Sequence, residues 1–294
     1  RRRYIMILKN AEVFNGDFEK IRAAVKIEGE KISKIGDFSS EEGLDLTGLV
    51  VMPGLIDMHI HGCGGADTGD ATPEALETMS QTLVKNGVTS FCPASMTLSF
   101  EELTKIFANI DAMKDKVGGA YIHGANMEGP YIAMSKKGAQ NPLYVRNPDK
   151  EEFKKLYEGC NGAIRVVDIA PECDGGDEFI KEIQPICPVS IAHTDAGYDE
   201  AVHAIELGVR HITHLFNAQS GLHHRKPGVV GAAFDVGRAN GVRAELICDG
   251  FHIHPATLRI AFREMGEDGT VIISDSMKAA GCPDGDYDLG GQPV

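Results

Sequence analysis

Imidazole and carboxylate side chains follow several short apolar runs in this chain of 294 residues. A borderline divalent ion such as zinc or iron(II) takes this combination of nitrogen and oxygen ligands. His59 and His61 are two residues apart, so on an extended segment both side chains point the same way. Other residues of this kind end later apolar runs: Glu128, His193, His214 and Asp275. If the runs are strands that meet at one rim, these side chains converge on a metal site with Asp275 as candidate general base.

Each of these residues taken alone has a plainer structural interpretation. The histidine pair can be polar residues at a strand end, Glu128 a loop carboxylate, and Asp275 an N-cap. His193 and His214 would by default be core histidines. Recurrence at successive strand ends is what favours the metal site. Other histidines fit strand, helix or capping roles better: His123, His203, His211 and His254.

Eight β-like runs alternate with helix-like segments in the larger part of the chain. The runs are 49–57, 89–93, 121–127, 164–169, 189–192, 210–213, 243–248 and 270–274. The clearest helical segments are 73–86, 100–116, 149–157, 199–207 and 255–265. Eight such units predict an α/β fold, a (β/α)8 TIM-like barrel. The alternative, a doubly wound sheet, requires a glycine-rich phosphate loop after the first strand, and the HIHG sequence at 59–62 is not one.

The start of the chain has a different pattern. Short strands are expected at 5–8, 23–27 and 31–35, separated by turn residues at Asn15-Gly16, Gly29 and Gly36. Such a piece is too small for a good core of its own. We therefore expect residues 1–50 to be the N-terminal part of a small β-sandwich domain and residues 51–294 to be the barrel. No helix is expected after the last barrel strand. We therefore expect both the small β-domain and the barrel to be truncated at the C-terminus.

Composition and charge narrow the class of partner and the compartment. The net charge of −14 argues against a nucleic-acid or anionic-membrane surface. A phosphorylated small molecule stays compatible, because it needs only a few donors and one or two cations. No apolar stretch is long enough to span a membrane. The seven cysteines include no CxxC pair, which favours reduced thiols in a cytoplasmic protein.

Five motifs carry a family resemblance. VMPGLIDMHIHG at 51–62 resembles the opening signature of the amidohydrolase superfamily. The other motifs resemble the N-acetylglucosamine-6-phosphate deacetylases within it. These are EGPY at 128–131, HLFNA at 214–218, CDGFH at 248–252, and SDS at 274–276 followed by AAG at 279–281. The resemblance runs from about residue 5 to the end of the sequence.

This resemblance implies metal-dependent removal of the acetyl group from N-acetylglucosamine 6-phosphate, in amino-sugar catabolism, by a homodimer. It implies one or two divalent ions per subunit, zinc or iron, with manganese, cobalt or nickel as further options. The implied ligands of the principal metal are Glu128, His193 and His214, and His59 and His61 match the pair that holds a second metal in some members. Asp275 matches the catalytic aspartate.

The resemblance also points to substrate-binding residues: Asn217, Ala218, Arg225, His252 and Gln140. An Asn amide and backbone N–H groups beside an Arg form an anion site suited to a sugar phosphate. Arg225 alone is equally compatible with a solvated loop cation. Gln140 stands where single-metal members often carry a His that touches substrate, so substrate contact from this loop stays open. A neighbouring subunit can also contribute to phosphate binding.

Three alternatives remain at this point. An amidohydrolase acting on a cyclic amide usually carries a carboxylated Lys at a strand end, whereas the third and fourth runs here offer Glu128 and Asp168. A deacetylase of N-acetylgalactosamine 6-phosphate is a closer variant. The third is an inactive metal-binding fragment, because the chain ends soon after the last expected strand.

Overall fold

The computed structural model describes residues 4–37 and 41–294. Contacts divide the chain after Gly54 into two compact units, the second of which is Leu55–Val294. The first unit is built on an antiparallel sheet of β1 (Ile5–Phe14), β2 (Lys20–Glu28) and β3 (Lys31–Gly36). Two short strands, β4 (Leu44–Asp45) and β5 (Val50–Val51), pair with β1 in parallel. Its buried core is small: Ala11, Val13 and Val25.

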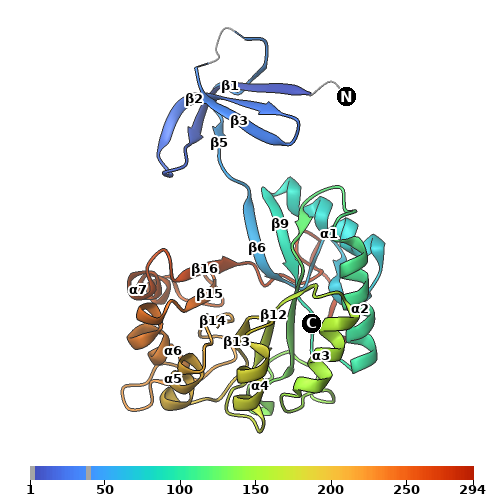
Figure 1. Cartoon of the computed structure of the whole chain (residues 1–294), viewed down its shortest axis with the longest axis vertical. Helices are drawn as coiled ribbons and strands as arrows, with labels where there is room; N and C mark the ends of the chain where they lie inside the picture. Colours follow the sequence, from blue (N-terminus) through green and yellow to red (C-terminus); the bar gives the residue numbers. More distant parts are fainter. Residues whose placement is uncertain (1–3, 38–40) are drawn as a thin grey trace. The chain divides into compact units, whose positions relative to one another are not determined.

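The second unit is a barrel of eight parallel strands, as the alternating pattern predicts (Figure 1). Every expected run overlaps one of these strands, although the first run begins before its strand and the third ends before its strand does. In chain order they are β6 (Leu55–Ile60), β9 (Val88–Pro93), β11 (Ala125–Tyr131), β12 (Ile164–Ile169), β13 (Val189–Ile191), β14 (His211–Ile212), β15 (Arg243–Ile247) and β16 (Thr270–Ile273). The third run is split, because β10 (Tyr121–Ile122) pairs with β9 before the chain turns through Gly124, at φ 139°, into β11.

Hydrogen bonds join the two ends of the barrel sheet. Strands β11 to β16 pair in sequence order, and β6 pairs with β9. A parallel bridge between Ala94 and Asn126 connects β9 to β11. On the other side, the Asp275 N–H donates to the His59 carbonyl oxygen at 3.0 Å. These contacts bring the ends of β16 and β6 together, so the last and first strands of the barrel share one rim.

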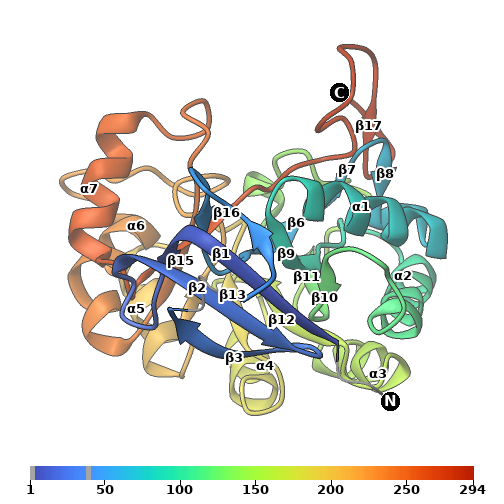
Figure 2. The ribbon, with the colours of Figure 1, turned by 90° about the horizontal axis from the view of Figure 1, so that it is seen from above.

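Helices cover the outside of these strands (Figure 2). They are α1 (Pro73–Lys85), α2 (Phe100–Met113), α3 (Lys150–Gly159), α4 (Gly176–Ile183), α5 (Tyr198–Glu206), α6 (Gly228–Ala232) and α7 (Pro255–Met265). Local sequence sets their starts. Thr72 caps α1 ahead of Pro73, and Ser99 and Glu102 form a capping box on α2. Their apolar faces bury large side chains against the strands, such as Phe107 and Phe153.

Two short hairpins complete the second unit. Strands β7 (Gly62–Cys63) and β8 (Ala66–Asp67) follow β6, and β17 (Asp288–Leu289) and β18 (Gln292–Pro293) lie near the end of the chain. The backbone after β16 binds to the first hairpin, because the N–H groups of Gly64 and Gly65 donate to the carbonyls of Ala280 and Lys278. Within the described residues, no helix is both long enough and apolar enough to cross a membrane.

Candidate metal centre

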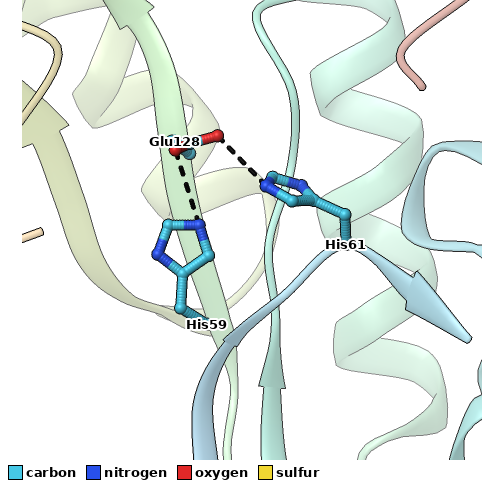
Figure 3. A group of neighbouring side chains, drawn as sticks. All are labelled: His59, His61 and Glu128. Carbon is cyan, nitrogen blue, oxygen red and sulfur yellow. Dashed lines mark ion pairs between the residues drawn. The ribbon is translucent and has the colours of Figure 1, made fainter. Parts of the chain in front are cut away.

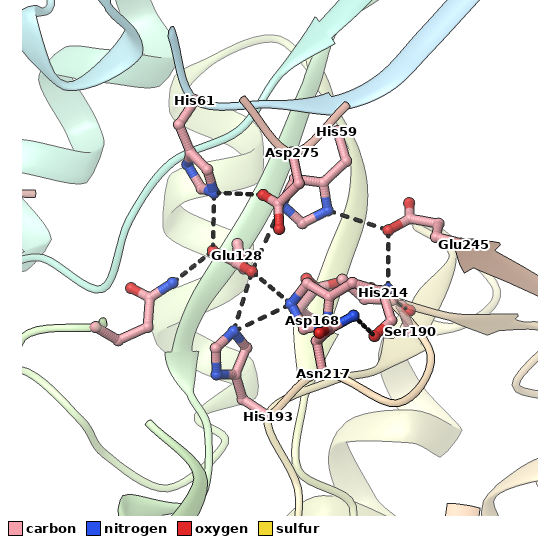
Figure 4. Close-up of polar contacts among 12 residues, drawn as sticks. His59, His61, Glu128, Asp168, Ser190, His193, His214, Asn217, Glu245 and Asp275 are labelled. Atoms are coloured by element: carbon pink, nitrogen blue, oxygen red, sulfur yellow. Dashed lines mark hydrogen bonds and ion pairs between the residues drawn. The ribbon is translucent and has the colours of Figure 1, made fainter. Parts of the chain in front are cut away.

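Glu128 lies in a buried cluster of side chains at the C-terminal ends of the barrel strands (Figure 4). Strand β11 carries Glu128, and the ends of β13 and β14 place His193 and His214 beside it. Glu128 Oε1 is 3.1 Å from His193 Nε2 and 2.9 Å from His214 Nε2. The two imidazole Nε2 atoms are only 3.2 Å apart. Nitrogen atoms that face one another around a shared carboxylate form a suitable donor set for a divalent cation.

The histidine pair at the end of β6 lies on the other side of the same carboxylate (Figure 3). His61 Nε2 is 3.2 Å from Glu128 Oε2, and His59 Nε2 is 3.5 Å from Glu128 Oε1. Glu128 therefore belongs to two groups of potential ligands, one with His59 and His61 and one with His193 and His214. Within each group the ligand atoms lie within 4.8 Å of one another. This geometry can hold one cation or two that share Glu128.

The outer ring nitrogens of two histidines are fixed by acceptors, which is the arrangement that metal-binding imidazoles use. His193 Nδ1 is 2.8 Å from the Lys136 carbonyl oxygen. That oxygen only accepts, so Nδ1 carries a proton. His59 Nδ1 is 3.1 Å from Glu245 Oε2 and donates in the same way. His59 Nε2 is buried without a hydrogen-bond partner. Buried polar atoms rarely lack a partner, so a cation fits this nitrogen well.

Protons and a cation compete for the imidazole nitrogens of this cluster. Burial disfavours charged His61, but Glu128 and Asp275 raise its pKa to about 10. Burial likewise disfavours ionised Glu128, but His61, His193 and His59 hold its pKa well below the usual value. Without a cation, the cluster therefore balances its carboxylates with protonated imidazoles. A metal that binds at these nitrogens displaces those protons.

The backbone is strained at three residues of the cluster. His193, His214 and Asp275 have φ angles of 43°, 30° and 49°, in the left-handed region that favours glycine. This conformation costs a residue with a side chain about 1–3 kcal/mol. Each of the three follows the end of a barrel strand, where the turn directs its side chain to the rim. The chain thus gives up some stability to place these three groups.

Asp275 lies beside both ligand groups on their open side. Its Oδ1 is 3.5 Å from His59 Nε2 and 3.4 Å from His61 Nε2. The side chain is 18% exposed, against 3% for Glu128. Burial raises the pKa of Asp275, but the charges of His59 and His61 lower it overall, so the carboxylate is ionised at neutral pH. An ionised carboxylate at this position can accept a proton from a reacting group and return it.

A cavity of about 360 Å³ opens over the cluster and is lined by most of the expected substrate-binding residues. Asn217, Ala218, His252 and Gln140 all lie in its wall. Arg225 does not. It lines a separate cavity of about 1100 Å³ together with His223 and Lys226. A backbone bridge between His223 and Lys226 forms a tight exposed turn, which holds Arg225 outside the wall of the metal pocket.

Gln140 supports the cluster from its loop. Its side-chain oxygen accepts a 2.6 Å hydrogen bond from the Thr97 N–H. Its amide nitrogen donates to Glu128 Oε2. With 2% of its surface exposed, Gln140 fixes the rotamer of the shared carboxylate. This structural role differs from the substrate contact that the sequence resemblance suggests for this position.

A polar network inside the barrel extends the cluster beyond the residues expected from sequence. Glu245 on β15 contacts both His59 and His211, the latter at 3.4 Å. His211 Nδ1 is 3.0 Å from Ser190 Oγ, and Ser190 is bonded to Thr213, which donates to Asp168. His211, expected to fit strand packing, is buried on β14, and its ring also lies in the network that reaches His59. His123, expected inside a strand, is exposed between β10 and β11.

The local sequence contained one signal for this network. Polar residues interrupt otherwise apolar strands at Asp168, Ser190, Thr213 and Glu245, and all four are fully buried. Burial raises the pKa of Asp168 well above its usual value. By contrast, nothing in the sequence marks the Lys136 carbonyl as the partner of His193.

The chain resembles proteins of known family over most of its length. The model of the amidohydrolase family matches residues 50–286. N-acetylglucosamine-6-phosphate deacetylase of Lysinibacillus sphaericus is 35% identical over 98% of this chain and 75% of the relative. The Bacillus subtilis enzyme of the same name is 39% identical over 83% of this chain and 62% of the relative. The crystal structure of the Pasteurella multocida deacetylase superposes with a TM-score of 0.91 at 28% identity, covering 99% of this chain and 76% of that one.

These comparisons confirm the fold and the resemblance expected from the motifs. The chain spans 75% of the length of the Lysinibacillus sphaericus relative and 62% of the length of the Bacillus subtilis relative. The matched residues include the whole cluster around Glu128 and all the residues that line the cavity above it except Leu289. The chain belongs to the amidohydrolase family, in the branch of the N-acetylglucosamine-6-phosphate deacetylases.

Proposed function

We propose that this chain, with a divalent cation bound at the cluster, hydrolyses the N-acetyl group of N-acetylglucosamine 6-phosphate to glucosamine 6-phosphate and acetate. One observation carries the proposal: Asp275 lies beside His59 and His61 in a cavity of about 360 Å³, where two ligand groups share Glu128. The two bacterial relatives compared above are deacetylases of that substrate by name. Another relative, from Escherichia coli O157:H7 and 34% identical over 83% of this chain, is named for N-acetylgalactosamine 6-phosphate.

One or two cations, zinc or iron, would be held by these ligands. Glu128, His193 and His214 form the principal site, and His59 and His61 form the second site together with Glu128. When bound by these residues, a cation would supply Lewis-acid chemistry to the amide carbonyl and would lower the pKa of a water molecule towards neutrality. The second site depends on His59, whose ring is fixed by Glu245.

Asp275 handles the protons of the reaction. As an ionised carboxylate it accepts a proton from the attacking water. It then returns the proton to the amine nitrogen, because an amide anion is a very poor leaving group. Its exposed edge faces the cavity, so one carboxylate can reach both the water and the leaving nitrogen.

Residues in the wall of the cavity orient the substrate. Asn217 and the backbone of Ala218 offer hydrogen-bond donors to the phosphate, and His252 extends this side of the pocket. Arg225 lines a different cavity, so we assign phosphate contact to Arg225 of the partner subunit in a homodimer. All seven cysteines are free thiols, which agrees with a reducing compartment, and we place the protein in the cytoplasm.

Acetate release from three substrates tests the proposal. N-acetylglucosamine 6-phosphate should be hydrolysed in preference to N-acetylgalactosamine 6-phosphate, and both in preference to unphosphorylated N-acetylglucosamine. Preference for the galactose isomer would replace the substrate that we propose. No release from any of them, by protein that contains metal, would mean that the residues of this chain form an inactive metal-binding unit.

A further inference from the structure

A second cavity, of about 580 Å³, lies at the opposite end of the barrel from the metal pocket. Its wall includes residues at the N-terminal ends of the strands, among them Asn126 on β11, Arg165 on β12 and Arg243 on β15. Arg210, just before β14, and His211 complete its polar lining with Gln184. None of its lining residues lines the metal pocket. It is therefore a separate site in space.

The charge at this cavity is opposite to that of the whole chain. Acidic residues outnumber Lys and Arg by 43 to 29, yet three arginines and no Asp or Glu line the cavity. Within residues 4–37 and 41–294, none of these three arginines forms a salt bridge. Two of them are anchored by backbone carbonyls. Arg165 Nε donates to His123, and Arg210 Nη1 donates to Ile205 and Val209. Their remaining N–H groups are available to an anion.

Deeper in the cavity wall, a buried amide has no partner. Asn126 is 1% exposed, and neither its Nδ2 nor its Oδ1 makes a hydrogen bond. His211 Nε2, by contrast, faces Glu245 Oε1 at 3.4 Å. Leaving a buried polar group unpaired costs about 1–3 kcal/mol, so such groups are rarely left without a ligand or water. The amide and the arginines together offer donors both inside the cavity and at its rim.

We propose that this cavity binds a phosphate group, either inorganic phosphate or the phosphate of a small metabolite. A phosphate carries up to two negative charges and three acceptor oxygens, which matches three guanidinium groups better than a single carboxylate does. The guanidinium groups of Arg165, Arg210 and Arg243 neutralise the phosphate, and Asn126 donates to the group that enters the cavity. A volume of about 580 Å³ falls within the range of small-molecule sites.

Calorimetric titration with inorganic phosphate and with glucose 6-phosphate tests this site. The variants are Arg210→Gln and Arg243→Gln, with Arg259→Gln, an exposed arginine on α7, as matched control. Each of the first two should weaken binding of the phosphate probe by about tenfold, as expected for loss of a charge-assisted hydrogen bond. The control should retain it. Arg210 precedes its strand and is exposed, so the Arg210 variant should fold and remain testable even if the Arg243 variant is unstable.

The two probes distinguish the sources of the phosphate. Equal affinity for both indicates inorganic phosphate, and tighter binding of glucose 6-phosphate indicates a sugar phosphate. Either result supports the site if the Arg210 variant binds the phosphate probe more weakly than the wild type does. Unchanged binding in the Arg210 and Arg243 variants, or an equal loss of binding in the Arg259 control, overturns the proposal.

Discussion

Replacing Glu245 by Gln tests whether the interior network supports the metal centre. Glu245 Oε2 is 3.1 Å from His59 Nδ1, and both side chains are fully buried. The substitution keeps the size of the side chain but removes its charge. A hydrogen bond to a charged group contributes about 1.5–3 kcal/mol, and one between neutral groups contributes about 0.5–1.5 kcal/mol. The variant should therefore lose about 1–2 kcal/mol of the free energy of metal binding through His59.

That loss corresponds to metal binding weakened about 5- to 30-fold, since about 1.4 kcal/mol is a factor of ten. It should fall on the site that contains His59 and His61. The site formed by Glu128, His193 and His214 should be affected less, because Glu245 does not contact the side chain of either histidine there. Replacing a residue that hydrogen-bonds to a metal ligand commonly reduces metal affinity by about 10- to 100-fold, which is the same order of magnitude.

The assay is a metal titration of the metal-free protein against a coloured competing chelator, which resolves a tighter and a weaker equivalent. Glu101→Gln, an exposed Glu on α2, serves as the matched control. Weakening of one equivalent in the Glu245 variant alone supports the reasoning. Two equivalents bound with the wild-type affinities would refute it.

Three further predictions follow from buried groups. The pKa of His61 is raised to about 10, so protonated His61 stabilises the metal-free fold fully below about pH 6.5. Urea unfolding should show this contribution to the free energy of unfolding disappear as the pH rises towards 10. A His61→Gln variant should lack this dependence of the unfolding free energy on pH. Gln140→Leu leaves the buried Thr97 N–H without its acceptor. The free energy of unfolding, measured at a fixed metal concentration, should therefore fall by about 1–3 kcal/mol. An unchanged urea midpoint would contradict this. Phe107→Ala in the core should cost about 3–5 kcal/mol, whereas Phe251→Ala, 94% exposed, should change the midpoint little; equal effects would contradict the burial pattern.

The sequence pattern predicted the barrel because each strand ends with its own signal. Apolar runs bounded by turn residues marked all eight strands, and the strand-end rule placed Glu128, His193, His214 and Asp275 on one rim. The short helix α4 (Gly176–Ile183) was not predicted, because it begins at a glycine without a side-chain cap. The third strand was predicted as one run because its break depends on the backbone angle of Gly124.

The supporting residues of the site were harder to predict, because their contacts are distant in sequence. Glu245 and His59 are 186 residues apart, and no local pattern pairs them. Gln140 reaches Thr97 across 43 residues, so its structural role is visible only in the folded chain. Arg225 shows the opposite case, since its motif suggested the metal pocket while its turn holds it at another cavity.

Acetate release from N-acetylglucosamine 6-phosphate by the wild type and by Asp275→Asn, with metal content measured on the same samples, tests the central claim most directly. The proposal predicts release by the wild type that requires metal. It predicts loss of turnover by at least about a hundredfold in the variant, as expected for removal of a general acid–base group, with metal retained. Undiminished release by a metal-containing Asp275→Asn protein would contradict the assigned role of Asp275 and the mechanism built on it.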